Sequence, residues 1–83
     1  MIIDYIHASM KRAEYEILDD KSIYAEIPIL KGVYANADTF EECRNELMEI
    51  LEEWIFIRLR QNLEIPVIDN IDLNIAELAD DTY

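Results

Sequence analysis

The fold is decided by residues 33–42, which read Val33-Tyr34-Ala35-Asn36-Ala37-Asp38-Thr39-Phe40-Glu41-Glu42. Up to Ala37, apolar and polar side chains alternate, and this pattern predicts a β-strand with one buried face. From Thr39 the pattern changes, because Thr39 and Glu42 form a capping box: the threonine hydroxyl accepts from the N3 amide and the glutamate reaches back to the cap amide. A strand therefore ends and a helix begins within this stretch.

The helix is predicted to run from about Thr39 to Asn62, because apolar residues recur at three- and four-residue steps. Its buried face is predicted to consist of Phe40, Cys43, Leu47, Ile50, Leu51, Trp54 and Arg58. The opposite face carries Glu42, Glu46, Glu49 and Glu53. We interpret these glutamates as a solvated helix face. Paired catalytic carboxylates are the alternative, and no further residues converge on them.

Two more alternating runs, residues 13–17 and 23–27, precede the decisive stretch. The turn-forming segment Asp19-Asp20-Lys21-Ser22 separates them, and a bend with a proline and the only glycine leads to the third run. Three short alternating runs joined by turns predict an antiparallel meander. Small side chains at Ala25 and Ala35 would let the helix pack closely. The sequence therefore predicts an α/β (α+β) fold, a three-stranded antiparallel meander packed on one long helix.

Both ends of the chain add to this core. Residues 2–12 carry one apolar stripe and predict a short N-terminal helix. The tail from Glu64 contains six acidic residues and no Lys or Arg, and it is expected to dock in partly extended form through Ile65, Val67, Ile68, Ile71, Leu73 and Ile75. Asn74 is expected to cap a short turn through Ala79. We predict a single domain over residues 1–83: an N-terminal helical extension (1–12), a core (13–68) and an acidic tail (69–83).

Charge and composition narrow the possible functions. The chain has 19 acidic and 7 basic residues and a formal net charge of −12. This balance argues against direct nucleic-acid binding and against anionic membrane surfaces, and it favours a basic protein partner. No signal peptide or membrane-spanning run is predicted, and we expect a cytoplasmic protein.

Residues capable of chemistry are few. One cysteine (Cys43) and one histidine (His7) do not make up a zinc site. Gly32 is the only glycine, so no phosphate-binding loop is predicted. We interpret Cys43 as a small buried hydrophobe and His7 as a surface or half-buried residue. We therefore expect no catalytic residue, no metal and no cofactor, and we do not expect an enzyme.

Two surfaces are candidates for protein contacts. The polar face of the meander carries Glu14, Glu16, Tyr24, Glu26, Tyr34 and Asn36, and the first five are the candidate partner-binding residues. Tyrosines among acids suit a protein interface, although antiparallel sheets also leave one polar face in water. The acidic tail from Asp69 to Asp81 is the second candidate for this contact.

The second candidate surface is the segment Trp54-Ile55-Phe56-Ile57-Arg58-Leu59, which is apolar around nearly the whole helix. Such a helix needs cover on more than one side. A second subunit would provide it through Trp54, Ile55, Phe56 and Leu59, so a homo-oligomer is expected. Alternatively, the N-terminal helix or the tail folds over this segment.

The order of these elements resembles the HicB-like family of antitoxin domains. The resemblance rests on Tyr24-Ala25-Glu26-Ile27-Pro28, on the bend Leu30-Lys31-Gly32-Val33, on residues 35–42, and on Ile65-Pro66. It covers about residues 13–68. Lys31 stands where the family usually has a proline, and the acidic segment after Pro66 is too short for the DNA-binding module that many such antitoxins carry.

The resemblance implies a β-α domain that binds and neutralises a small basic RNA-cleaving toxin of the HicA type, and the net charge of −12 agrees with such a partner. The alternative is a stand-alone homo-oligomeric adaptor domain with no toxin partner. A short basic protein encoded next to this chain would favour the antitoxin.

Overall fold

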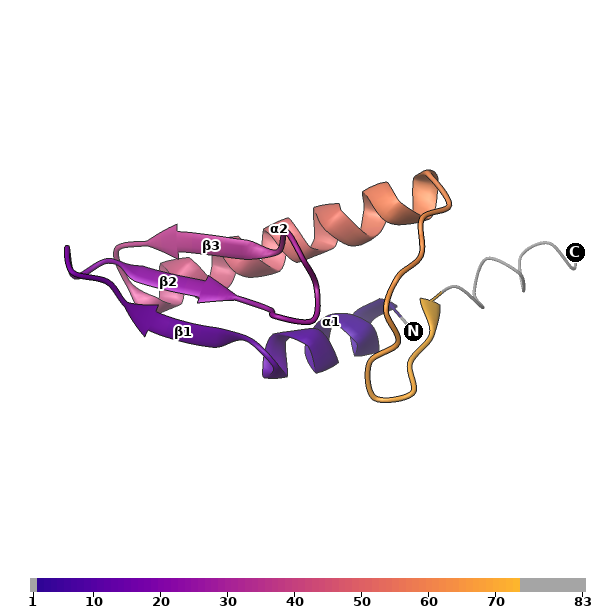
Figure 1. Cartoon of the computed structure of the whole chain (residues 1–83), viewed down its shortest axis with the longest axis horizontal. Coiled ribbons are helices and arrows are strands. Elements are labelled where there is room, and N and C mark those ends of the chain that lie inside the picture. The colour runs from indigo at the N-terminus through magenta and orange to yellow at the C-terminus, as the bar shows by residue number, and fades with distance from the viewer. Residues whose placement is uncertain (1, 74–83) are drawn as a thin grey trace, which may run out of the picture.

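A computed structural model describes residues 2–73, and the turn expected at residues 74–79 lies outside this range. In chain order the elements are α1 (Ile2–Lys11), β1 (Glu14–Ile17), β2 (Ile23–Glu26), β3 (Tyr34–Ala37) and α2 (Phe40–Arg60). The strands form an antiparallel sheet in the order β1-β2-β3, with α2 behind it and α1 leading into β1 (Figure 1). The predicted α+β fold is confirmed.

The long helix α2 begins at the predicted capping box. Thr39 is the N-cap, and its Oγ1 accepts a hydrogen bond from the Glu42 amide at 3.1 Å. The threonine hydroxyl also donates to Glu42 Oε1 at 3.1 Å, so the carboxylate meets the cap side chain instead of the expected cap amide. At the other end Asn62 has a left-handed backbone (φ 54°), and the Leu63 amide donates to the Arg58 carbonyl at 2.9 Å. This left-handed residue ends the helix.

The register of the sheet sorts its side chains onto two faces. Tyr15 lies opposite Ala25, and Ala25 lies opposite Ala35, so these three share the face toward α2. The helix packs mainly against β3 and next against β2. Cys43 comes close enough that its Sγ lies 3.7 Å from the Ala35 carbonyl oxygen. The buried alanines on β2 and β3 therefore permit the close packing that the sequence predicts.

The hydrophobic core lies between α2 and the inner face of β2 and β3, and it continues to α1 and the tail. Its buried members include Tyr5, Ile23, Ala25, Ile27, Leu30, Val33, Ala35, Cys43, Leu47, Leu51, Ile55, Ile65, Ile68 and Leu73. Phe40 was predicted on the buried face of the helix, but it is 54% exposed. It is the first residue of α2, and its ring lies against Tyr15 of the edge strand, at 6.0 Å between centroids.

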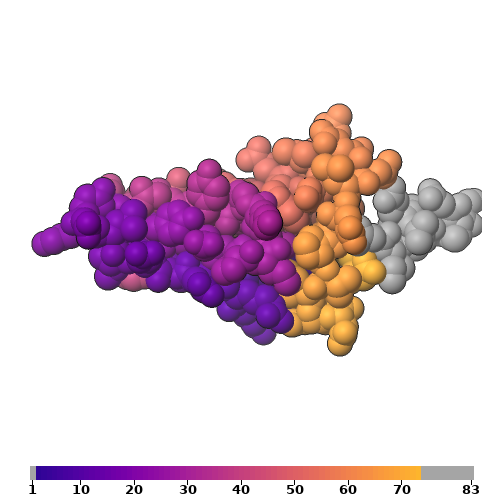
Figure 2. Space-filling view, in the orientation of Figure 1, coloured from indigo at the N-terminus to yellow at the C-terminus, as the bar shows by residue number. Residues whose placement is uncertain are grey.

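One side of the apolar second half of α2 is covered by the chain itself. α1 packs on α2, and the tail places Ile65, Ile68 and Leu73 in the same core, so the expected docking of the tail is confirmed for these residues. Figure 2 shows the orange and yellow atoms of the tail against the indigo atoms near the N-terminus. Val67, which was also expected to dock, is exposed.

Tyr5 in α1 and Arg12 just after it both contact the tail. Tyr5 is fully buried, and its hydroxyl donates to the Pro66 carbonyl oxygen at 2.5 Å. Arg12 pairs with Asp69, but both side chains are about half exposed, and exposed pairs of this kind add little stability. The buried Tyr5 contact is therefore the more important of the two.

The bend between β2 and β3 needs its glycine for conformational reasons. Gly32 has φ +95°, a backbone region that other residues rarely adopt. Beside it, the Trp54 indole N–H donates to the Lys31 carbonyl oxygen at 3.2 Å. The bend thereby holds Trp54 in place on α2.

We expect Tyr5→Phe to lower the free energy of unfolding at neutral pH by about 1 kcal/mol, because the Pro66 carbonyl loses this donor. Burial, followed by the negative charge of Asp72, raises the pKa of Tyr5 to about 12. A phenol with a raised pKa stabilises the fold below its unfolded pKa of about 10, and this contribution falls as the pH rises toward 12. The difference between wild type and variant should therefore shrink from pH 7 to pH 11.

Urea unfolding at both pH values measures this difference, and Tyr15→Phe, at an exposed tyrosine, is the control. A difference for Tyr5→Phe that is equal at pH 7 and pH 11 would contradict the assigned role.

Candidate functional site

The five predicted partner-binding residues lie together on the face of the sheet opposite α2. In one row across the strands Glu14 lies opposite Glu26, which lies opposite Tyr34. In the next row Glu16 lies opposite Tyr24, which lies opposite Asn36. We call this surface the acidic sheet face, and it consists of Glu14, Glu16, Tyr24, Glu26, Tyr34 and Asn36.

The glutamates of the acidic sheet face repel one another. Glu14 and Glu26 are direct cross-strand partners, and like charges at such positions destabilise a sheet. In the part of the chain that the structure describes, neither carboxylate is in an ion pair with Lys or Arg. The face therefore holds negative charge that the described residues do not neutralise.

Two tyrosines form the aromatic part of this face. The rings of Tyr24 and Tyr34 lie 6.3 Å apart at an interplanar angle of 30°, so they are stacked. Desolvation, followed by the negative charge of Glu26, raises the pKa of Tyr24, which keeps its hydroxyl protonated. Tyr34 is 57% exposed and offers its ring to solvent. The two rings therefore form an aromatic surface next to the carboxylates of Glu16 and Glu26.

A polar network orders the β1–β2 turn beside this face. The Asn36 amide donates to Ser22 Oγ at 3.0 Å and to the Ile23 carbonyl at 2.9 Å. Ser22 donates to Asp20 Oδ1 through its hydroxyl at 2.6 Å and its amide at 2.9 Å, and these bonds lower the pKa of Asp20. Asp20 stays ionised and adds negative charge at the end of the face.

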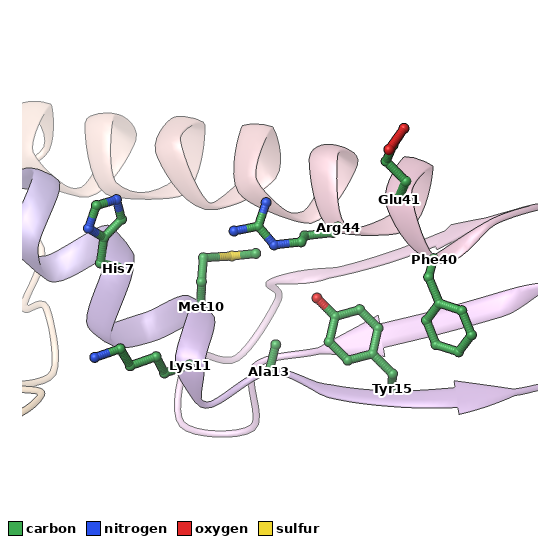
Figure 3. Close-up of a pocket in the computed structure, with 8 residues that line it drawn as sticks. All are labelled: His7, Met10, Lys11, Ala13, Tyr15, Phe40, Glu41 and Arg44. Atoms are coloured by element: carbon green, nitrogen blue, oxygen red, sulfur yellow. The ribbon is translucent and has the colours of Figure 1, made fainter.

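An open groove lies on the other side of the sheet, between α1, β1 and the start of α2 (Figure 3). Met10, Ala13, Tyr15 and Phe40 supply its apolar lining, and its polar residues are His7, Lys11, Glu41 and Arg44. Arg44 reaches from α2 toward α1 (Figure 3). The sequence pattern did not predict this groove, because it placed Phe40 on the buried face of the helix.

Cys43 and His7, the two residues considered for chemistry, lie in different surroundings. Cys43 is buried, and burial raises the pKa of its thiol, so the thiol form persists. His7 is exposed on α1, and Glu41 lies at the opposite end of the groove (Figure 3). Within residues 2–73, no three His, Cys, Asp or Glu side chains are grouped as a metal site would require. Over the same residues, no helix has the length and hydropathy to cross a bilayer.

The residues of the predicted self-association segment differ in how exposed they are. Ile55 is 2% exposed and belongs to the core, so it is not available to a second copy, and its assignment to that surface is corrected. Trp54 is half-buried, with Arg58 stacked over its ring at 4.6 Å, and Leu59 is half-buried as well. Phe56 is 58% exposed and Ile57 is also exposed. The N-terminal helix and the tail cover one side of this segment, as in the alternative interpretation. On another side Phe56 is exposed.

Comparisons with known proteins agree with this architecture. A family model described as UPF0150-like matches residues 4–66. The crystal structure of TTHA0281 from Thermus thermophilus is similar to this chain, with 32% sequence identity and a TM-score of 0.80. The similarity covers 86% of this chain and 89% of that one. A search of the curated proteins found no match.

We expect Glu26→Lys to raise the free energy of unfolding by about 0.5 kcal/mol, because it replaces a like-charge pair with an opposite-charge pair across from Glu14. Glu26→Gln should give a smaller gain, since it removes the repulsion without adding an attraction. Both gains should decrease in about 1 M salt, where exposed charges are screened. Urea unfolding at low and high salt measures them. A stability that is unchanged or lower in Glu26→Lys would show that the repulsion is negligible.

We expect the chain to form at least a dimer at micromolar concentration through the exposed Phe56, and Phe56→Glu to return it to a monomer. Burying an added carboxylate in an apolar contact is unfavourable. Light scattering measures the mass. The control is Asn45→Glu, which adds the same charge to the exposed surface of α2 about 16 Å away along the helix. If Phe56→Glu stays folded with an unchanged mass, the contact lies elsewhere.

Proposed function

The chain belongs to the UPF0150-like family, and on this premise we propose that it is an antitoxin of the HicB-like type. Its partner is a small basic toxin of the HicA type, which cleaves RNA. The antitoxin binds the toxin and blocks it, and it carries out no reaction of its own. Because the toxin would cleave RNA in the cytoplasm, we expect both proteins to lie there.

The observation that carries the proposal is the uncompensated charge of the acidic sheet face. Glu14 and Glu26 are held opposite each other by the register, and Glu16 lies in the adjoining row. Lys or Arg side chains from a partner would convert this repulsion into attraction. The net charge of −12 supports the same partner chemistry at long range.

The stacked Tyr24 and Tyr34 supply the apolar part of such a contact. Tyrosine buries a large area and loses little side-chain entropy, and this is why it is frequent among the residues that dominate binding energy. Arg side chains of a basic partner can also stack on these rings. The tyrosines are therefore expected to control dissociation of the complex, and the glutamates its formation.

Electrostatic attraction predicts fast and salt-sensitive association. Opposite charges steer the encounter of two proteins, and salt near 0.15 M screens this attraction beyond about 8 Å. The association rate should therefore fall as salt rises, while dissociation changes less.

A stand-alone homo-oligomeric adaptor remains the second candidate, and the exposed Phe56 and Ile57 favour it. Apolar side chains at one end of α2 suit contact with a second copy. The two functions differ in whether a basic protein encoded beside this chain is toxic alone and harmless together with it.

Co-expression tests the proposal. The neighbouring basic protein is expected to arrest growth when it is expressed alone, and this chain to restore growth. The triple variant Glu14→Lys, Glu16→Lys, Glu26→Lys should restore growth poorly, because it presents positive charge to a basic toxin. The matched control is Glu46→Lys, Glu49→Lys, Glu53→Lys, which makes the same change in net charge on the exposed side of α2.

Full rescue by the control and weak rescue by the sheet variant is the expected result. Equal rescue by both variants would place the toxin contact away from the acidic sheet face. A neighbour that never arrests growth would leave the adaptor as the better account.

A further inference from the structure

The outer edge of β1 is unpaired within the described sheet. The strand order is β1-β2-β3, so β1 has a neighbour on one side only. All four of its residues, Glu14–Ile17, are exposed. An unpaired edge presents backbone N–H and C=O groups that can pair with another chain.

The register identifies which backbone groups face outward. The Leu18 amide donates to the Ser22 carbonyl oxygen at 2.9 Å, so this pair is hydrogen-bonded across the two strands. Hydrogen-bonded and non-bonded pairs alternate in an antiparallel ladder. Glu16 and Glu14 therefore direct their backbone groups toward β2, and Tyr15 and Ile17 direct theirs toward the free edge.

The side chains of β1 alternate in chemistry as well. Glu14 and Glu16 lie on the acidic sheet face, while Tyr15 and Ile17 point toward the layer of α2. α2 packs on β3 and β2, so Tyr15 is 38% exposed and Ile17 is 62% exposed. Apolar side chains thus flank the free edge on one face and carboxylates flank it on the other.

We propose that the free edge of β1 is a strand-addition site for an extended segment of the basic partner, in which Lys or Arg alternates with apolar residues. This inference rests on the proposed function and specifies how the partner binds. The segment pairs with the outward backbone groups of Tyr15 and Ile17. Its basic side chains lie beside Glu14 and Glu16, and its apolar side chains lie beside Tyr15 and Ile17, where no helix covers β1.

A second copy of this chain fits the same edge poorly. Pairing β1 with its own copy would bring Glu14 and Glu16 of both chains onto one face, and like charges across strands are destabilising. Charges on edge strands commonly prevent such self-pairing. The edge therefore discriminates in favour of a strand of opposite charge.

The probe for this site is a capped synthetic hexapeptide in which lysine and valine alternate, added to the ¹⁵N-labelled full chain at about 50 mM salt. The control peptide has the same composition, with its valines and lysines in separate blocks. We expect the alternating peptide to slow amide hydrogen exchange of Tyr15 and Ile17 at least about tenfold. Exchange at Glu14 and Glu16 should change much less, because their amides already bond to β2.

Ile17→Pro removes one outward donor and leaves the β1–β2 ladder intact, so it should abolish binding of the alternating peptide. The matched control Ile17→Thr keeps the amide and the β-branched side chain and should retain binding. A second measurement uses the unmodified chain and changes the peptide instead. N-methylation of the peptide residues that pair with the edge should abolish binding, and N-methylation of the intervening residues should not.

Equal binding of both peptides, or full binding to a folded Ile17→Pro chain, would overturn strand addition. These measurements contain no toxin, so they are independent of the co-expression test. Rescue that persists in Ile17→Pro overturns strand addition and leaves the antitoxin function intact. If the neighbouring protein is harmless and the alternating peptide still slows amide exchange of Tyr15 and Ile17, the antitoxin function is overturned. The edge is then supported as a binding site.

Discussion

One helix cannot cover three strands, and the exposed inner side of β1 follows from that constraint. A helix with its side chains is about 10 Å wide, while neighbouring strands lie about 4.8 Å apart. α2 therefore covers two strands, and the close approach of Cys43 to Ala35 holds it over β3 and β2. The remaining strand, β1, keeps an exposed inner face with an open groove beside it.

Charge is divided between the two sides of the sheet. Three glutamates lie on the outer face, away from α2. On the inner side, the groove has Lys11, Arg44 and the only histidine among its lining residues. Within the sheet itself, the carboxylates are therefore gathered on the outer face. The stacked tyrosines lie on that same side.

The N-terminal helix and the tail complete the core around the far half of α2. The bond from Tyr5 to the Pro66 carbonyl joins segments at opposite ends of the described chain. With these segments in place, Ile55 is buried and Phe56 is left exposed. The surface available to a second copy is therefore set by how the ends of the chain fold back.

The sequence by itself determined the elements and the face to which each strand residue belongs. The capping box at Thr39 and the two-residue alternation before it are local signals, and the strands and α2 begin and end within a few residues of the predicted positions. The same alternation grouped Glu14, Tyr24 and Tyr34 on one face, because side chains in a strand point to opposite sides in turn. Only the tertiary structure decided which strand α2 leaves uncovered, why Phe40 is exposed and Ile55 buried, and which amides of β1 face outward. These features depend on the lateral position of α2 and on contacts between residues far apart in the chain, and no local periodicity encodes either of them.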